Sequence, residues 1–472
     1  MLFRQIFDER LAQYSYLVGC QRTGAAIVID PERDVDRYLD LAARNGLRLE
    51  AVTETHIHAD FVSGARELAA RDPQVRVYLS GEGGEEWAYR WPETDGRACT
   101  LLCSGDSIRV GNVELRAQHT PGHTPEHLVF HVVDHGGGAD QAMALLAGDF
   151  VFVGDLGRPD LLESAAGVVG AREPSARSLF ASARRFLDLP EWLQVWPGHG
   201  AGSACGKALG AVPSTTVGYE RRFSPAFAAV GAGEGAFVDF ILAGQPEPPV
   251  YFARMKRWNR DGAPILGELP RPQRLDAGGL VRAADRGVAL DTRRDRSAYF
   301  ARHLRCSLFA PFNRSFPTIA GSYVEPDQEI VLIVEPENLE EAVRNLIRVG
   351  LDRITGWSPA ATVDELPETA VASTPHIDFA DGGFDRALAE PGALVLDVRG
   401  AAEFEDGHVE GAVQMAHTRL AVEAGELPRD RTLLVHCEVG SRSSSAASYL
   451  ERRGFEVRYV DGQLANWLAR TG

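Results

Sequence analysis

Short apolar runs that read as strands alternate with longer runs of helical character along this chain. The runs from Leu47 to Thr53, Glu329 to Val334 and Thr432 to Val435 have the length and content of buried strands. The last of them leads through a tight loop into a helix-like run that ends at Arg453. We therefore expect an α/β protein in which reactive side chains stand on the turns that follow strands.

The turn after the first of these runs carries a dense group of metal-binding residue types, His56, His58 and Asp60. Three later turns, each after an apolar run, add one donor apiece. Imidazoles and carboxylates suit zinc, iron or manganese, and donors that converge from several strand ends are typical of a catalytic metal site. The later donors are His123 in Thr120-Pro121-Gly122-His123-Thr124, Asp149 in Ala147-Gly148-Asp149, and His199 in Pro197-Gly198-His199-Gly200.

Together these motifs resemble the metallo-β-lactamase fold over about the first 245 residues. The family pattern is H-x-H-x-D-H followed by a His, a bridging Asp and a last His, and it usually holds two metals. Here the second metal would need Asp60, position 61 and His199, but position 61 is Phe61. Because a phenyl ring cannot bind an ion, the resemblance favours a mononuclear centre over a dinuclear zinc hydrolase.

Within this superfamily, a mononuclear centre resembles that of the persulfide dioxygenases, which hold ferrous iron with two histidines and one carboxylate. Carried over by motif, the ligands are His56, His123 and Asp149, with one Fe(II) per chain; spacing alone does not choose between His56 and His58. Such a set leaves open positions for substrate sulfur and dioxygen. The donors expected to orient these ligands or to exchange protons around the ion are His58, Asp60 and His199.

Three further residues are candidates for substrate chemistry. Cys205 stands in the glycine-rich loop after His199 and resembles a cysteine near the iron in fusions of persulfide dioxygenase with rhodanese, which implies a sulfur relay or persulfide acceptor. An inert buried thiol is the alternative. Arg158 and Tyr219 are expected to hold the carboxylates or phosphates of a thiol carrier, with a solvated surface role as the alternative.

Near the C-terminus, Cys437 opens a six-residue loop that closes at Arg442. A thiol in this place lies at a helix N-terminus, where unpaired backbone N–H groups favour the thiolate. The loop resembles the active loop of rhodaneses, sulfurtransferases that carry a sulfane sulfur as a cysteine persulfide. Cys437 is therefore the expected nucleophile, with Arg442 as a positive neighbour. The alternative is a phosphatase-like C-x5-R loop, which normally closes one residue later.

A weakened copy of this pattern precedes it, because Val288 to Arg293 echoes Val395 to Arg399. A second rhodanese-like unit is implied. Its strand Glu329 to Val334 should end at the nucleophile, but Glu335-Pro336-Glu337-Asn338 follows, without a cysteine. This middle domain is expected to be inactive, and Cys306, which lies in a different segment, is read as a small buried residue.

The length of 472 residues, with 44% apolar content, is enough for about three domains. The expected architecture is α/β throughout: an αββα metallo-β-lactamase sandwich followed by two doubly wound rhodanese-like domains. Segments rich in charge, proline or threonine are read as linkers, namely Arg254 to Arg260, Pro264 to Pro272 and Glu365 to His376. The expected domains are residues 1–250 for the persulfide dioxygenase, 251–362 for the rhodanese-like domain without its cysteine, and 375–472 for the active rhodanese.

Composition limits the partners and the cellular compartment that we expect for these domains. A net charge of −17 argues against nucleic acid as a partner. No stretch of eighteen apolar residues occurs, and Met1 to Arg4 leads straight into a strand-like run, so neither export nor a membrane span is expected. The six cysteines show no disulfide framework, which together with a sulfur-carrying thiol indicates a reducing, cytoplasmic setting. The resemblance implies a homo-oligomer.

These inferences give one main hypothesis for the function. A low-molecular-weight thiol persulfide, such as that of glutathione or coenzyme A, is oxidised by dioxygen at the iron to sulfite and free thiol. A second persulfide loads Cys437, and its sulfane sulfur passes to sulfite to form thiosulfate, which removes sulfide equivalents. The alternatives are a zinc thioester hydrolase of the glyoxalase II kind fused to a rhodanese, and a non-enzymatic protein whose rhodanese units bind other proteins.

Overall fold

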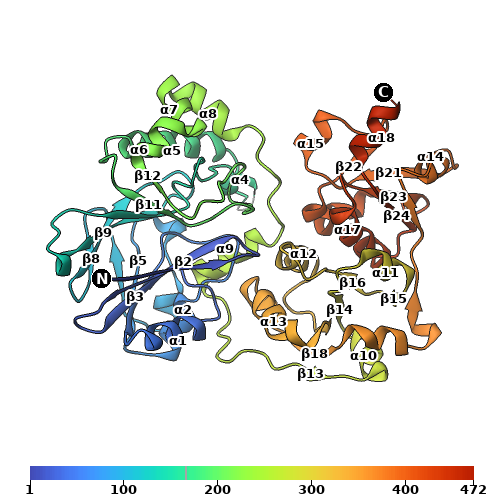
Figure 1. Cartoon of the computed structure of the whole chain (residues 1–472), viewed down its shortest axis with the longest axis horizontal. Helices are drawn as coiled ribbons and strands as arrows, with labels where there is room; N and C mark the ends of the chain where they lie inside the picture. Colours follow the sequence, from blue (N-terminus) through green and yellow to red (C-terminus); the bar gives the residue numbers. More distant parts are fainter. Residues whose placement is uncertain (165–166, 472) are drawn as a thin grey trace. The chain divides into compact units, whose positions relative to one another are not determined.

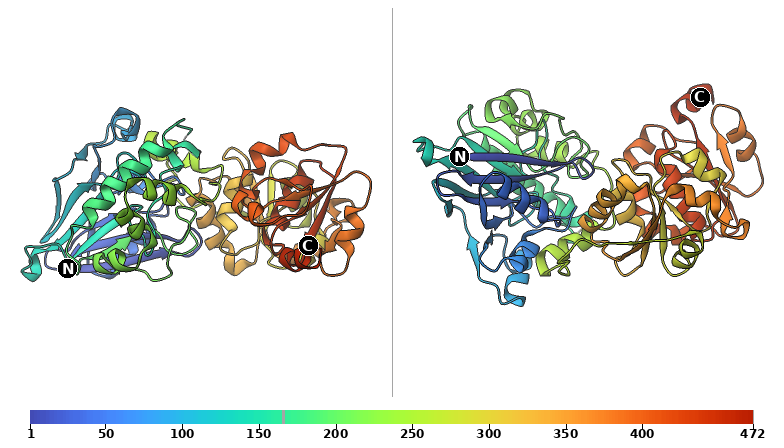
Figure 2. Two further views of the ribbon diagram at one scale, coloured as in Figure 1. Left: turned by 90° about the horizontal axis from the view of Figure 1, so that it is seen from above. Right: turned by 60° about the horizontal axis from the view of Figure 1, so that its bottom comes forward.

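In the computed structural model, which describes residues 1–164 and 167–471, the chain divides into two compact units (Figure 1). The first comprises Met1–Gln245 and Tyr251–Glu268, and the second comprises Pro246–Val250 and Leu269–Gly472. Each unit is seen from two further directions in Figure 2. Over the described ranges, none of the helices combines the length and the apolar character that crossing a membrane requires.

The first unit is built on two six-stranded sheets that pack face to face. Strand β2 shows how one sheet contributes to two cores, because its side chains point alternately to opposite faces of the sheet. Tyr16 and Val18 enter the core between the sheets, whereas Leu17 joins the core on the outer face of the first sheet. In sheet order, the first sheet is β1 (Leu2–Asp8), β2 (Gln13–Cys20), β3 (Ala25–Ile29), β4 (Arg48–Thr53), β5 (Arg76–Ser80) and β6 (Cys99–Leu102), and the second is β12 (Thr215–Thr216), β11 (Gln194–Pro197), β10 (Ala144–Gly148), β9 (Leu128–Asp134), β8 (Val113–His119) and β7 (Ser107–Val110).

Helices cover the outer face of each sheet and complete an αββα sandwich (Figure 1). The expected N-terminal fold is confirmed. Apolar side chains on one stripe of each helix join the outer cores, as Tyr38 and Leu68 do under the first sheet and Leu179 does under the second. The helices are α1 (Asp36–Arg44) and α2 (Ala65–Arg71) on the first sheet, and α5 (Arg172–Phe186), α7 (Pro225–Ala232) and α8 (Glu234–Leu242) on the second; short helices are α3 (Trp91–Thr94), α4 (Leu161–Ser164) and α6 (Val217–Phe223).

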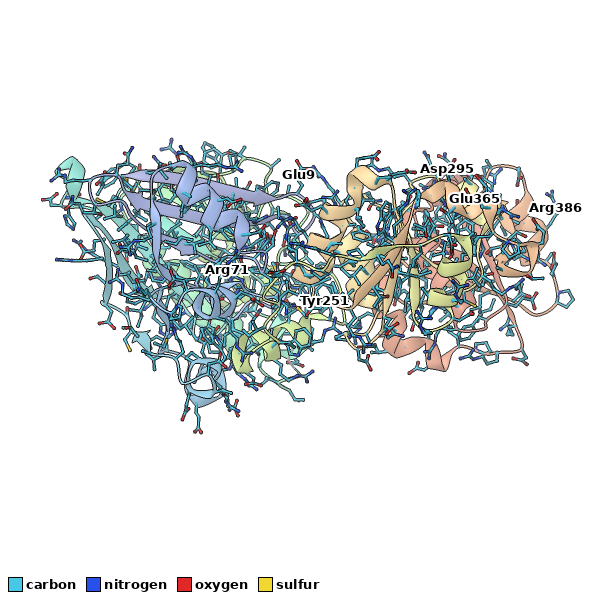
Figure 3. The ribbon with its side chains drawn as sticks, turned by 90° about the horizontal axis from the view of Figure 1, so that it is seen from below. Glu9, Arg71, Tyr251, Asp295, Glu365 and Arg386 are labelled. Atoms are coloured by element: carbon cyan, nitrogen blue, oxygen red, sulfur yellow. The ribbon has the colours of Figure 1, made fainter. Side chains whose placement is uncertain are left out.

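The segment read from sequence as a linker is instead a helix of the first unit, α9 (Phe252–Asp261), which follows Tyr251 (Figure 3). Its basic residues dominate the sequence pattern, but Phe252 and Met255 are fully buried. Beyond the helix, the Glu67 carboxylate accepts hydrogen bonds from backbone amides of the returning chain. The first unit therefore extends to Glu268, past the boundary that we expected at residue 250.

The second unit contains two parallel five-stranded sheets with the same strand order. In both, the first strand in the chain is followed across the sheet by the fifth, fourth, second and third. This repetition agrees with the two rhodanese-like patterns in the sequence. The middle sheet is β13 (Gln273–Arg274), β18 (Ile354–Ser358), β17 (Ile330–Ile333), β14 (Val288–Asp291) and β16 (Leu308–Phe309); the C-terminal sheet is β20 (His376–Asp378), β24 (Val457–Asp461), β23 (Thr432–His436), β21 (Ala393–Asp397) and β22 (Val413–Gln414).

Helices flank both sheets, and several begin at side-chain caps. Asp295 (Figure 3) accepts a hydrogen bond from the Ala298 amide at the start of α11, which satisfies one of the free N–H groups there. The helices are α10 (Ala277–Ala284), α11 (Arg296–Ala301), α12 (Phe316–Tyr323) and α13 (Leu339–Arg348) in the middle domain, and α14 (Gly383–Leu388), α15 (Ala401–Asp406), α16 (Leu420–Glu423), α17 (Ser441–Arg452) and α18 (Leu464–Thr471) in the C-terminal domain.

The reading of Cys306 as a buried residue was wrong. It lies in the turn between β15 (His303–Leu304) and β16, and its side chain is exposed. Its φ of 61° is unusual for a residue other than glycine. Cys306 is therefore exposed because it lies in a turn and not in the core.

Candidate metal and sulfur sites

Two histidines and one aspartate from three turns converge in the first unit. His56 follows β4, His123 lies between β8 and β9, and Asp149 follows β10. All three are buried, with donor atoms within 4.8 Å of one another. The Nε2 atoms of His56 and His123 lie 3.9 and 3.5 Å from Oδ2 of Asp149. In the described part of the chain, neither carboxylate oxygen of Asp149 has a hydrogen-bond partner. Both oxygens are therefore available to bind a metal ion.

Hydrogen bonds on the far sides of the rings select the tautomers that leave Nε2 free. The Thr55 hydroxyl donates to Asp30 at 3.0 Å, so its oxygen is left to accept from Nδ1 of His56 at 2.9 Å. Nδ1 of His123 donates to the carbonyl of Arg158 at 3.1 Å. Each imidazole therefore directs an Nε2 lone pair towards Asp149, which is the arrangement that a metal-binding histidine requires.

The structure separates His56 from His58, which spacing could not do. Nε2 of His58 lies 3.0 Å from Oδ1 of Asp30. Burial alone would lower the pKa of His58, but Asp30 outweighs it and raises the pKa to about 9. For His56, burial followed by the neighbouring His58 holds the pKa well below its usual value. His56 is thus the neutral imidazole, and His58 is paired with a carboxylate.

Asp149 is surrounded by imidazoles. His199 joins the other two, with Nε2 3.4 Å from Oδ2 of Asp149. Burial would raise the pKa of Asp149, but His199 and then His56 and His123 outweigh it and hold the pKa well below its usual range. A fourth ring, His127, accepts a hydrogen bond from the Asp149 backbone N–H at 3.1 Å. His127 was missed from the sequence, although it follows His123 by four residues in the same turn.

A second group of donors adjoins the first. Asp60, His199 and Cys205 are buried, and their donor atoms also lie within 4.8 Å of one another. Nε2 of His199 is 3.4 Å from Oδ2 of Asp60. Burial, followed by the charge of Asp60, raises the pKa of Cys205 to about 12. Phe61 instead packs its ring against that of His58, with centroids 4.4 Å apart.

The loop with the first ligands is held by a residue that no sequence motif indicated, Asn259 of α9. Its side-chain nitrogen donates to the carbonyls of His58 and Phe61, at 2.8 and 2.7 Å. Its side-chain oxygen accepts from the Ser63 N–H at 2.9 Å. One buried amide therefore satisfies three backbone groups of this loop.

The two residues expected to hold substrate are placed differently. Arg158 is buried, and Nη2 and Nε donate to Asp160 at 2.6 and 3.0 Å, while Nη1 donates to the carbonyl of Ala204 at 3.0 Å. Its guanidinium thus contacts other residues of the protein, and its role in substrate binding stays a prediction. Tyr219 lies on α6 with its side chain exposed beside Phe223, and its role in substrate binding stays a prediction.

In the C-terminal domain, Cys437 lies between β23 and α17, where the loop residue Gly440 has a φ of 83°. The Ser443 hydroxyl is 3.5 Å from Sγ of Cys437. Arg442 makes two hydrogen bonds to Glu403 of α15, at 2.5 and 2.7 Å. The expected nucleophile thus stands at the start of a helix, and the arginine that closes the loop is fixed by a carboxylate.

The middle domain repeats the supporting contacts without the nucleophile. In the C-terminal domain, Arg399 binds Asp397 through Nε and Nη2 and also donates to the carbonyl of Gly407. In the middle domain, Arg293 binds Asp291 in the same way and donates to the carbonyl of Arg302. After β17, however, the chain enters a short 3₁₀ turn at Pro336–Asn338. The repeat is therefore visible at the level of single side chains.

Comparison with known proteins agrees with this geometry. The Metallo-beta-lactamase superfamily profile matches residues 8–199, and the Rhodanese-like domain profile matches residues 383–470. The bovine (Bos taurus) protein named "Persulfide dioxygenase ETHE1, mitochondrial" is 31% identical over 201 residues, which are 42% of this chain and 68% of that protein.

Two further relatives place the chain among proteins of differing function. A crystal structure of a metallo-beta-lactamase from Staphylococcus aureus is 38% identical, with a TM-score of 0.67, and the match covers 76% of this chain and 99% of that one. A hydroxyacylglutathione hydrolase from Rhodospirillum rubrum is 30% identical over 186 residues, 39% of this chain and 61% of that protein.

Proposed function

We propose, since the chain belongs to the metallo-β-lactamase superfamily and ends in a rhodanese-like domain, that it is a persulfide dioxygenase and thiosulfate-forming sulfurtransferase. The observation that carries the proposal is the buried set of donors His56, His123 and Asp149, in which the Asp149 oxygens have no hydrogen-bond partner within the described residues. The same chain also carries the Cys437 loop. Both centres suit the same element, sulfur.

The first set of donors fits a single ferrous ion. Both oxygens of Asp149 are buried without a hydrogen bond within the described chain, which is costly unless a cation binds there. Two neutral imidazoles and one carboxylate are the donor set of non-haem Fe(II) oxygenases. When bound, iron would supply open positions for sulfur and dioxygen and the redox change that zinc lacks.

The chain's own residues hold this centre in place and restrict water. Thr55 and the carbonyl of Arg158 fix the two ligand rings, while His127 fixes the backbone of Asp149. Phe61 and Phe152 are fully buried and place apolar surface beside His58 and His199. Their rings would exclude water from a reactive sulfur.

The proposed reaction balances in two stages. In the first, a thiol persulfide, dioxygen and water give the free thiol, sulfite and protons. In the second, another persulfide transfers its outer sulfur to the Cys437 thiolate and leaves as a thiol; sulfite then attacks the outer sulfur and departs as thiosulfate, which regenerates the thiolate. The Ser443 hydroxyl lies 3.5 Å from Sγ of Cys437, and the free N–H groups at the start of α17 would stabilise the sulfur that is transferred.

Product analysis tests the coupling of the two centres. Anaerobically purified protein loaded with ferrous iron is given glutathione persulfide, with oxygen uptake, sulfite and thiosulfate measured together. Cys437→Ser should leave oxygen uptake unchanged and divert the product from thiosulfate to sulfite. His123→Ala should lose iron and oxygen uptake together. Unchanged product in the first variant would remove the coupling, and retained uptake in the second would overturn the ligand set.

The similarity to a hydroxyacylglutathione hydrolase supports one competing proposal, a zinc thioester hydrolase fused to a rhodanese. The two functions differ in their metal. One iron per chain with oxygen uptake supports the dioxygenase, whereas zinc with hydrolysis of a glutathione thioester, and no oxygen uptake, supports the hydrolase.

A further inference from the structure

A basic cavity lies in the second unit, where the middle domain meets the end of α17, and it has no role in the reaction above. Its volume of about 720 Å³ is within the range that small-molecule sites occupy. We propose that it binds a low-molecular-weight disulfide that carries carboxylates or phosphates, and that Cys306 exchanges with this ligand to form a mixed disulfide. The charged and thiol side chains that line the cavity are Asp285, Arg286, Arg305, Cys306, Arg452 and Arg453.

The lining of this cavity is positively charged, whereas the whole chain has a net charge of −17. Within the described residues, only Arg286 of the four arginines pairs with a carboxylate, and Oε2 of Glu329 lies 3.8 Å from its Nε. Arg305 and Arg452 donate to backbone carbonyls, which do not compensate their charge. An anionic ligand would supply that compensation, and the fork of arginine N–H groups matches carboxylates and phosphates.

The cysteine of the cavity lies in a turn that the arginines hold, and its side chain is exposed. Arg452 donates to the carbonyl of Cys306 through Nη1 at 2.7 Å and to the carbonyl of Gly287 through Nη2 at 3.0 Å. The backbone N–H of Arg305 donates to the carbonyl of Ala370 at 2.8 Å. A fixed, exposed thiol among several cations suits an anionic reaction partner, because the cations raise the local concentration of anions.

The exchange needs no reactant besides the disulfide R–S–S–R. The Cys306 sulfur attacks as a thiolate, and the S–S bond of the ligand breaks as a new S–S bond forms to the protein. The leaving thiolate takes up the proton that the Cys306 thiol lost. One disulfide replaces another, so there is no net oxidation. The middle domain would thus respond to the disulfides of anionic thiols without the nucleophile that is missing after β17.

Cys103 is an internal control, because it is the other exposed cysteine among the six. Its surroundings are acidic. Its backbone N–H donates to Oδ2 of Asp106 at 2.7 Å, and the N–H of Ser104 donates to Oε1 of Glu82 at 2.9 Å. An anionic reagent should therefore be repelled at Cys103 and attracted at Cys306. Comparing the two cysteines in one sample cancels the intrinsic reactivity of the reagent.

The probes are glutathione disulfide, which is anionic, and 2-hydroxyethyl disulfide, which is neutral. Full-length protein is treated with each, and modification of each cysteine is followed over time by peptide mass spectrometry. We expect the ratio of the Cys306 rate to the Cys103 rate to be about tenfold higher with glutathione disulfide, and this preference to shrink at high salt. An equal ratio for the two reagents would overturn the proposal.

Substitutions test the arginines that do not hold the turn. Arg286→Gln and Arg453→Gln should each lower the preference for glutathione disulfide by about threefold. Arg353→Gln is the matched control and should keep it, because Arg353 also pairs with Glu329 but does not line the cavity. Equal thermal melting of the variants and the wild type shows that they fold. An unchanged preference in both cavity variants would also overturn the proposal.

A competitor distinguishes a binding site from attraction by charge alone. S-methylglutathione carries the same carboxylates but cannot form a disulfide. It should protect Cys306 from the neutral reagent in a saturable manner and leave Cys103 reactive. Absence of protection, or equal protection of both cysteines, would show that the cavity is not a binding site. None of these measurements involves iron, oxygen or Cys437, so their outcome is independent of the function proposed above.

Discussion

Arg296 and Asp461 form a two-pronged ion pair although 165 residues separate them. Nε and Nη2 of the arginine donate to the two carboxylate oxygens at 2.9 and 2.8 Å, and Nη2 also donates to the carbonyl of Val439 at 3.1 Å. Asp461 in turn packs so closely against Gly440 that an added Cβ there would clash with it. An arginine of the middle domain therefore braces the loop that carries Cys437.

Arg296→Ala is expected to slow sulfur transfer without removing the nucleophile. The pair is partly exposed, so its loss should cost about 1 kcal/mol, which corresponds to roughly a fivefold effect if the loop must be ordered for transfer. The measurement is the rate of sulfur transfer from thiosulfate to cyanide. Arg302→Ala is the matched control, because Arg302 of the same domain pairs with the exposed Glu368. Equal rates in both variants would remove the bracing role.

Asn259→Ala is expected to loosen the loop of the proposed iron ligands. The substitution leaves two carbonyls and one N–H of the loop unpaired in a buried place, at about 1 kcal/mol each. Destabilisation of about 3 kcal/mol and weaker iron binding should follow, measured by urea unfolding and by iron titration. Asn259→Asp keeps the acceptor for the Ser63 N–H but turns a buried carboxylate oxygen towards the two carbonyls, so it should lose at least as much.

The control for this prediction is Asn45→Ala in the same unit. Asn45 is partly exposed and donates to the carbonyl of Leu41 at the end of α1, away from the ligands. Its replacement should leave iron binding unchanged. If both variants bind iron like the wild type, α9 has no part in positioning the ligands.

The local elements could be predicted from the sequence. The runs from Leu47, Glu329 and Thr432 are confirmed as β4, β17 and β23, and the helix after Cys437 as α17. Each of these depends on periodicity and on a following turn, which are properties of neighbouring residues. The same reasoning indicated which turns carry donors, because polar residues directly after buried strands are conspicuous.

The contacts between distant segments could not be predicted in this way. Asn259 lies in a strongly basic stretch that resembles a linker, and its partners are about 200 residues away. The sequence gives only a weak indication of Asp30 as a site residue, namely its place directly after the apolar run of β3. Its role is revealed only by its contacts with Thr55 and His58. Which of two neighbouring histidines is neutral depends on such contacts and not on spacing.

Gly198→Ala is expected to reduce metal binding by a steric clash alone. An added Cβ would come within 2.5 Å of Oδ1 of Asp149 and within 2.9 Å of the carbonyl carbon of Gly148, so the carboxylate or its strand must shift. Iron affinity should fall at least tenfold, while sulfur transfer by the C-terminal domain stays unchanged. Gly231→Ala in α7 is the control, since an added Cβ there meets nothing within 4 Å. Iron titration with normal affinity in Gly198→Ala would show that Asp149 is not a ligand.

The stability of the C-terminal domain is expected to depend on pH through His417. Burial, followed by the nearby Arg442, lowers the pKa of this imidazole from 6.5 to about 4. Because the folded state disfavours the protonated ring, the stabilisation is fully present above pH 6.5 and is lost as the pH falls towards 4, by up to about 1.4 kcal/mol per pH unit. Protonation would also place a second cation beside Arg442 and weaken its bonds to Glu403.

His417→Gln removes the titrating ring. The variant should therefore lack the part of the acid-induced loss of stability that comes from His417. Hydrogen exchange of α17 peptides, compared between wild type and variant at the same pH, cancels the intrinsic pH dependence of exchange. The protection of the wild type relative to the variant should decrease steadily from pH 6.5 to pH 4.5. A difference that stays constant over this range would mean that His417 titrates normally in the folded protein and that its burial does not govern the acid stability of the rhodanese loop.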